Sequence, residues 1–270
     1  MEEELLGGDL LYRVEDGVAW LRLNRPDMAN ALTPDQRNTM IDLFRDVDQD
    51  RDVRVVVLGA TGGRHFCGGA DLRANRSEPA EEPVTGTVMK MIGYGVQRLV
   101  AAILDCQKPV IASVPGTAAG IGVQLAIASD LVVMAAEASF VEVFVQRGIV
   151  PDGGAAYLLT RLCGVQRAKE LMLLGEKVGA AKAKEYGLVT EVVPRAELDA
   201  RTAAVAATLA AGPTVAIGLM KRLANRALDS DRAGALFDEA MAQEVVMTTT
   251  DAQEGVAAFV ERRSTAFRGY

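Results

Sequence analysis

Two glycine-rich turns carry the residues of this chain best suited to chemistry. Residues 65–72 read HFCGGADL, and residues 115–122 read PGTAAGIG. Each turn follows an apolar run typical of a buried strand and precedes a helical pattern. Because glycine lacks a Cβ, backbone N–H groups in such turns can approach a ligand closely. Two such turns can aim two N–H groups at one oxygen atom, forming an oxyanion hole for charge that develops on a carbonyl.

Five motifs, in order along the chain, resemble those of the crotonase family, the enoyl-CoA hydratases and isomerases. They are NRPDMANAL at 24–32, FCGGADL at 66–72, KPVIA at 108–112 with the glycines that follow, VPDGG at 150–154 and EGVAAFVERR at 254–263. The resemblance covers nearly the whole chain. It implies an α/β fold, a crotonase-like spiral of ββα units followed by a C-terminal helical trimerisation region. It also implies an acyl-CoA thioester as substrate.

The resemblance assigns the oxyanion hole to the backbone N–H groups of Ala70 and Ile121. A helix expected to begin near Gly120 would point its positive end at the same oxygen atom. Ile121 stands where glycine is common in the family, so its side chain is expected to narrow the site. The alternative is that the glycines only form tight turns.

The acid–base residues depart from those of the family's hydratases, which use two glutamates. By the resemblance, the first position falls on Gln124 and the second on Phe144, which are expected to line the substrate pocket. Water addition needs one group that activates water and another that delivers a proton. An amide and a phenyl ring can do neither, so ordinary hydratase chemistry is not expected.

Asp152 is the best remaining carboxylate, because its PDGG motif resembles that of isomerase-like members. The alternative is that Asp152 caps a helix, in which case bonds to helix N–H groups would lower its pKa and weaken it as a base. Glu142 is the second candidate, and its direction depends on where the preceding strand ends. For Glu142, a polar or interface role is the alternative.

Coenzyme A contacts follow from the resemblance alone. The backbone of Met28, Ala29 and Ala31 is expected to line the adenine and pantetheine, with Asp71 and Leu72 in the same wall. Three arginines are expected either to meet phosphates or to be solvated surface charges: Arg25, Arg73 and Arg262. A structural role is expected for His65, the single histidine, and Cys67 fits equally well as a small buried hydrophobic residue.

Composition narrows the remaining classes of function. The chain has 270 residues, half of them hydrophobic, and a net charge of −7. An acidic chain without a basic stripe argues against nucleic acid as a partner. The uncharged stretch between Lys108 and Asp130 contains prolines and glycines, so no membrane span is expected there. The three cysteines form no paired motif, which with the acidic N-terminus indicates a cytoplasmic protein. No metal cluster and no permanently bound cofactor are expected.

Local sequence patterns predict the helices, strands and loops that carry these motifs. A hairpin is expected at Leu10–Glu15 and Val18–Leu23, and a helix from Pro34 to about residue 50, capped by Thr33. Further expected elements are strands at 53–60, 131–134 and Glu191–Val193, a loop at 73–83 and a helix at 87–104. Residues 1–211 are expected to form the α/β core and residues 212–270 a helical oligomerisation region. Apolar side chains on those helices predict a homotrimer or a dimer of trimers.

The sequence therefore predicts an acyl-CoA enzyme that stabilises a thioester enolate. Double-bond isomerisation of an enoyl-CoA, with Asp152 as the acid/base, is the first hypothesis. One alternative is an enoyl-CoA hydratase with non-standard acid/base residues. The other is a non-catalytic acyl-CoA binder that keeps the oxyanion hole and lacks the glutamates.

Overall fold

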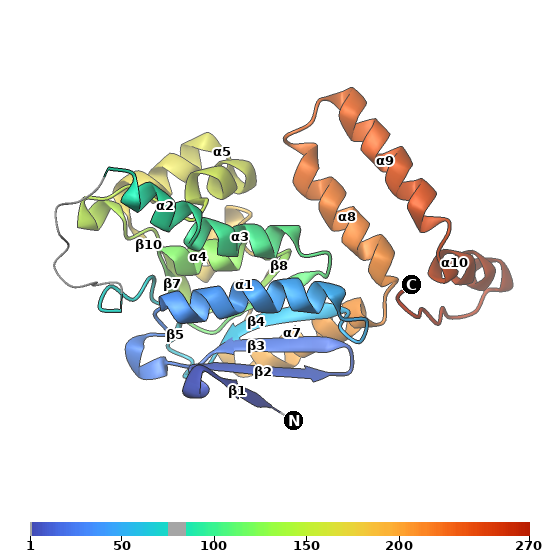
Figure 1. Ribbon diagram of the computed structural model, residues 1–270, viewed down its shortest axis with the longest axis horizontal. Coiled ribbons are helices and arrows are strands. Elements are labelled where there is room, and N and C mark those ends of the chain that lie inside the picture. Colours follow the sequence, from blue (N-terminus) through green and yellow to red (C-terminus); the bar gives the residue numbers. More distant parts are fainter. Residues whose placement is uncertain (1, 75–84) are drawn as a thin grey trace.

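A computed structural model describes residues 2–74 and 85–270, and its backbone is organised by two sheets (Figure 1). Within the described residues, the larger sheet has seven strands in the order β1-β2-β3-β4-β6-β8-β11. Strands β1 to β3 are antiparallel, and from β3 onward the pairing is parallel. The strands are β1 (Glu3–Leu5), β2 (Leu10–Glu15), β3 (Val18–Leu23), β4 (Val55–Ala60), β6 (Val110–Val114), β8 (Leu131–Ala135) and β11 (Glu191–Val193).

The smaller sheet has the order β10-β9-β7-β5 in the part of the chain that is described. Its members are β5 (His65–Cys67), β7 (Thr117–Ala119), β9 (Ser139–Val141) and β10 (Lys177–Gly179). Strands β5, β7 and β9 are parallel, so their carboxyl ends lie at the same edge. The chain repeatedly visits the large sheet, then the small sheet, then a helix: β4-β5-α2-α3, β6-β7-α4 and β8-β9-α5. This is the expected spiral of ββα units.

The core lies between the large sheet and the helices around it. Strands β4 and β6 are almost entirely buried, as their continuous apolar runs require of central parallel strands. Helix α1 (Pro34–Gln49) packs against α3 (Val96–Asp105), and α7 (Leu198–Ala210) packs on β4, β6 and β8. The expected cap of α1 is confirmed, because Thr33 and Gln36 each bond the other's backbone N–H.

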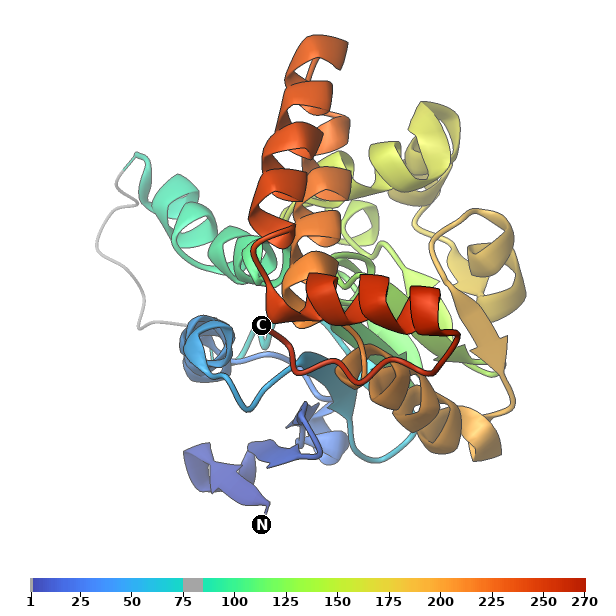
Figure 2. The same ribbon diagram turned by 90° about the vertical axis from the view of Figure 1, so that its right-hand side faces the viewer.

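Three helices follow the core and extend away from it (Figures 1 and 2). They are α8 (Thr214–Ala227), α9 (Arg232–Val246) and α10 (Thr250–Glu261), and α8 lies against α9. Large apolar side chains on them are exposed, including Met220, Leu236, Phe237 and Phe259. The remaining helices are α2 (Thr87–Gly93), α4 (Ile121–Ile127), α5 (Ala155–Leu174) and α6 (Ala180–Glu185).

Most expected elements are confirmed, but the single helix expected at 87–104 is wrong. The structure divides it into α2 and α3 at Gly95, where a Cβ would lie 2.3 Å from the Met91 carbonyl oxygen. Only glycine can occupy this bend. The stretch Thr87–Asp105 is long and apolar enough to cross a membrane, but the break interrupts it and α3 buries one face in the core. Of the expected loop at 73–83, residues 75–83 lie outside the described residues.

Candidate active site

The first glycine-rich turn leaves the Ala70 N–H free to point away from the neighbouring chain segment. Leu32 N–H donates to the Gly69 carbonyl at 2.9 Å, and Asp71 N–H donates to the Leu32 carbonyl at 2.9 Å. In a trans peptide the N–H and C=O point in opposite directions. The Ala70 N–H, which shares its peptide group with the Gly69 carbonyl, therefore points away from Leu32. Gly69 has φ +107°, which favours glycine at this position.

The second turn presents the Ile121 N–H from the neighbouring strand of the small sheet. Ile121 is the first residue of α4, so its N–H has no partner within the helix. The two turns pack closely. A Cβ on Gly122 would lie 2.3 Å from the Cys67 carbonyl oxygen, and one on Gly69 would lie 3.3 Å from the Ala119 carbonyl oxygen. Parallel pairing of β5 with β7 thus brings together the two turns expected to form an oxyanion hole.

Gln124 and Glu142 form a buried pair beside these turns, which sequence reasoning did not anticipate. Gln124 Nε2 donates to Glu142 Oε1 at 2.7 Å, and both side chains are buried. Burial raises the pKa of Glu142 to about 7, with the Gln124 hydrogen bond opposing this rise and the charge of Asp152 adding to it. Glu142 directly follows β9, so its direction is set where that strand ends.

Asp152 lies on the segment that packs over the start of α4. A Cβ on the adjacent Gly153 would lie 2.6 Å from Ile121 Cδ1 and 3.8 Å from Gln124 Cγ. The alternative that Asp152 caps α5 is wrong, because the N-cap is Gly154 and no side chain caps the helix. Partial burial raises the pKa of Asp152. A carboxylate free of helix N–H bonds keeps the basicity that capping would remove.

Phe144, which was expected at the second glutamate position of the hydratases, lies against the second turn. The side chain is buried, and a Cβ on Gly120 would lie 3.7 Å from Phe144 Cζ. It therefore contributes an apolar surface there. Cys67 is also fully buried, and burial raises the pKa of its thiol to about 11, so it supplies no thiolate at neutral pH. Burial and the neighbouring Arg64 lower the pKa of His65.

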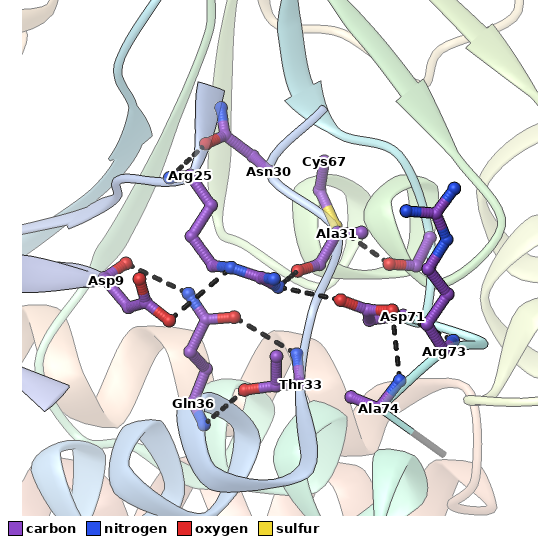
Figure 3. Close-up of polar contacts among 11 residues, drawn as sticks. Asp9, Arg25, Asn30, Ala31, Thr33, Gln36, Cys67, Asp71, Arg73 and Ala74 are labelled. Carbon is purple, nitrogen blue, oxygen red and sulfur yellow. Dashed lines mark hydrogen bonds and ion pairs between the residues drawn. The ribbon is translucent and has the colours of Figure 1, made fainter. Parts of the chain in front are cut away.

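The guanidinium of Arg25 is occupied by contacts within the protein, so the phosphate contact expected as one option for Arg25 is not favoured. Figure 3 shows its guanidinium between Asp9, Ala31 and Asp71. Arg25 Nη1 lies 2.9 Å from Asp71 Oδ2 and 2.9 Å from the Ala31 carbonyl, and its Nε lies 3.4 Å from Asp9 Oδ2. Burial opposes ionisation of Asp71, but hydrogen bonds from Arg25, Ala74 and Arg73 hold its pKa below the usual value.

The strip expected to contact coenzyme A, formed by residues 28–31 together with Asp71 and Leu72, runs beside the first turn. Ala29 accepts a hydrogen bond from Gly68 N–H at 2.8 Å, while Met28 and Leu72 expose apolar side chains. Arg73 is exposed, and its side chain extends away from the Asp71 carboxylate (Figure 3).

Asn30 holds this strip in place and was missed by sequence reasoning. It is buried in a left-handed conformation, and its side chain bonds the Arg25 N–H and the carbonyls of Thr61 and His65. The signal available in the sequence was that asparagine tolerates positive φ better than most residues.

Arg262 does not join these residues. It ends α10 on the exposed C-terminal region, which lies at the opposite end of the molecule from β5 and β7 (Figure 1). A phosphate contact from Arg262 to a ligand bound at its own chain's turns is therefore not favoured. The other predicted site residues are gathered on the turns after β5 and β7, on α4 and on the segments packed against them.

Comparison with known proteins agrees with this architecture. The family model described as enoyl-CoA hydratase/isomerase matches residues 13–270. The chain is 35% identical to the 1,2-epoxyphenylacetyl-CoA isomerase of Escherichia coli, covering 96% of this chain and 98% of that protein. It is 32% identical to the crotonyl-CoA hydratase of Syntrophomonas wolfei, covering 96% and 97%.

A crystal structure of an enoyl-CoA hydratase from Mycobacterium smegmatis superposes with a TM-score of 0.88 at 33% identity, covering 95% of this chain and 98% of that one. The chain therefore belongs to the enoyl-CoA hydratase/isomerase family of crotonase-fold enzymes. Both isomerases and hydratases occur among its relatives, so membership by itself leaves the reaction open.

Proposed function

We propose that this protein isomerises the double bond of an enoyl-CoA thioester, with Asp152 as the acid/base. The observation that carries the proposal is the state of Asp152, a partly buried carboxyl group that caps no helix and belongs to the segment packed over the start of α4. The two positions where hydratases carry glutamate hold Gln124 and Phe144. One carboxylate is enough to move a proton along a chain, whereas water addition needs two groups.

In the proposed reaction, the thioester carbonyl oxygen accepts hydrogen bonds from the Ala70 and Ile121 N–H groups. Asp152 removes a proton from the carbon next to the thioester, and the electron pair of that C–H bond moves onto the carbonyl oxygen as an enolate. The N–H groups stabilise the enolate; removing one such donor in other enzymes costs about 2.7–4 kcal/mol. Asp152 then returns the proton to the γ-carbon, and the double bond becomes conjugated with the thioester.

The substrate is held, in this proposal, by its coenzyme A portion along Met28, Ala29, Ala31 and Leu72, with Arg73 available to a phosphate. Coenzyme A enters as part of the substrate and no permanent cofactor is invoked. We further propose that the chain assembles as a homotrimer or a dimer of trimers through α8 to α10. The division at residues 211 and 212 and the cytoplasmic location stay predictions.

A panel of 3-enoyl-CoA thioesters of differing chain length tests the proposal. Conversion to the conjugated 2-enoyl-CoA is followed by the ultraviolet absorbance of the product and by its mass spectrum after separation. Isomerisation that disappears in an Asp152→Asn variant supports the assignment. If no thioester in the panel isomerises while a 2-enoyl-CoA is hydrated, the hydratase alternative takes its place. The proximity of Glu142 to Asp152 is the observation that favours that alternative.

A further inference from the structure

The buried Gln124–Glu142 pair leaves two oxygen atoms without a visible partner. Gln124 Nε2 donates to Glu142 Oε1 at 2.7 Å. Gln124 Oε1 and Glu142 Oε2 are both inaccessible to solvent, and neither has a hydrogen-bond partner among the described residues. Buried polar atoms in native proteins are nearly always paired, so two unpaired oxygens on one contact pair call for an explanation.

The two oxygens cannot satisfy each other if Glu142 is ionised. A carboxylate and an amide oxygen are both acceptors, whereas a protonated carboxyl group carries one O–H donor. Both atoms are closed off from bulk solvent. A proton on Glu142 Oε2 is a donor that the pair itself can provide, and Gln124 Oε1 is the unpaired acceptor on the partner residue.

We infer that Glu142 is a neutral carboxylic acid in the resting enzyme, donates its proton to Gln124 Oε1, and acts as a positioning residue that keeps the surroundings of Asp152 free of a second negative charge. The first part of this inference rests on the two unpaired buried oxygens and on the contact between the two side chains. The second part rests on the proposed function, since it assigns Asp152 as the base.

The electrostatic surroundings agree with a neutral Glu142. Burial is the main cause that raises the pKa of this carboxyl group to about 7. The charged group that acts on it is Asp152, from the segment packed over α4, and this charge raises the pKa further. Gln124 on α4, which contacts the carboxyl group directly, is uncharged. Strand β10 runs beside β9 with Lys177 opposite Val141, and the neighbouring Glu176 and Lys177 are both exposed to solvent. A second carboxylate beside Asp152 would meet repulsion.

This protonation state matters for the proposed reaction. The enolate places negative charge near Asp152, and an ionised Glu142 would oppose that charge while leaving the Gln124 oxygen without a donor. Activity is therefore expected to fall above neutral pH as Glu142 ionises, by about tenfold for each pH unit if only the protonated form is active.

Infrared difference spectroscopy of the full-length protein tests the proton directly and needs no turnover. We expect a carboxylic-acid C=O band at pH 6 that diminishes by pH 9 and is missing from a Glu142→Gln variant. It should persist in Asp152→Asn, which removes the other nearby carboxyl group. In Gln124→Met the band should move to higher frequency, because the C=O group loses its hydrogen bond from Nε2. Absence of any Glu142-dependent band at pH 6 would overturn the inference.

The pH profile tests the positioning role. A glutamine at position 142 can still donate to Gln124 Oε1 and accept from its Nε2, so the pair should keep its shape but can no longer ionise. The ratio of kcat at pH 9 to kcat at pH 6 should therefore be higher in Glu142→Gln than in the wild type. An unchanged ratio would overturn the positioning role. Should no thioester turn over, the spectroscopic result still decides the protonation state, and the failure lies with the proposed function.

Discussion

Lys221 Nζ lies 2.8 Å from Asp130 Oδ2, and this ion pair fastens α8 to the segment between α4 and β8. Lys221 is buried and also donates to the carbonyls of Ile103 at 2.9 Å and Lys108 at 3.3 Å. Burial raises the pKa of Asp130, while Lys221 opposes the rise. The C-terminal helices are thus joined to the core by a desolvated contact that must remain paired.

Lys221→Met is expected to destabilise the protein strongly, because the partly buried Asp130 carboxylate loses its cation and keeps the Val110 N–H as a donor. Removing one partner of a buried pair typically costs about 3–5 kcal/mol. Urea unfolding followed by circular dichroism measures the loss. Lys182→Met is the matched control: Lys182 lies 2.9 Å from Glu170 on the surface, and its loss should leave the unfolding free energy close to that of the wild type. Equal effects of the two substitutions would contradict the role given to Lys221.

Asp152→Asn is expected to abolish isomerisation while leaving acyl-CoA binding and stability intact. Asparagine keeps the size of the side chain but cannot accept the proton, and Asp152 caps no helix whose stability it could change. Loss of a general acid/base typically lowers kcat by about 10²–10⁴-fold. Stopped-flow kinetics and calorimetry with an acyl-CoA separate turnover from affinity.

Asp46→Asn, on the exposed face of α1, is the control for that experiment and should behave as the wild type. A fully active Asp152→Asn enzyme would remove Asp152 from the mechanism and direct the search to Glu142.

Hydration of a short 2-enoyl-CoA is expected to be slow, by about 10²–10⁴-fold relative to a hydratase that has both acid/base groups. The reason is that, by the resemblance to the family, Gln124 and Phe144 stand at the two positions of the glutamate pair. The loss of conjugated thioester absorbance measures the rate, and the crotonyl-CoA hydratase of Syntrophomonas wolfei serves as the positive control. Turnover at the rate of that control would instead show that Asp152 and Glu142 form a working pair.

The protein is expected to run as a trimer or a dimer of trimers in light scattering at micromolar concentration. Phe237 on α9 and Phe259 on α10 are 65% and 85% exposed, and apolar surface on helices so far from the core calls for a covering partner. Phe237→Asp should lower the measured mass, whereas Asp46→Ala on the core helix α1 should not. A wild-type monomer would refute the assembly.

Residue types and their order were enough to locate the reactive region. The glycines at positions 69 and 122 are required where backbone meets backbone, so their spacing alone marked both turns. Continuous apolar runs likewise marked β4 and β6, because burial on both faces leaves an unbroken apolar pattern, and the Asp16-Gly17 turn pair marked the hairpin. The lack of glutamate at positions 124 and 144 was also legible in the sequence.

Tertiary structure decided how the polar side chains are used, because partners far apart in sequence leave no local pattern. Glu142 meets Gln124 only because parallel β7 and β9 end at the same edge and α4 starts there. Arg25 is neutralised by Asp71, 46 residues away, and is thereby removed from the candidates for phosphate binding. Asp152 is left uncapped because α5 starts only at Ala155, with Gly154 as its N-cap. The sequence shows which chemical groups are present. Packing determines their protonation states and the directions in which their side chains point.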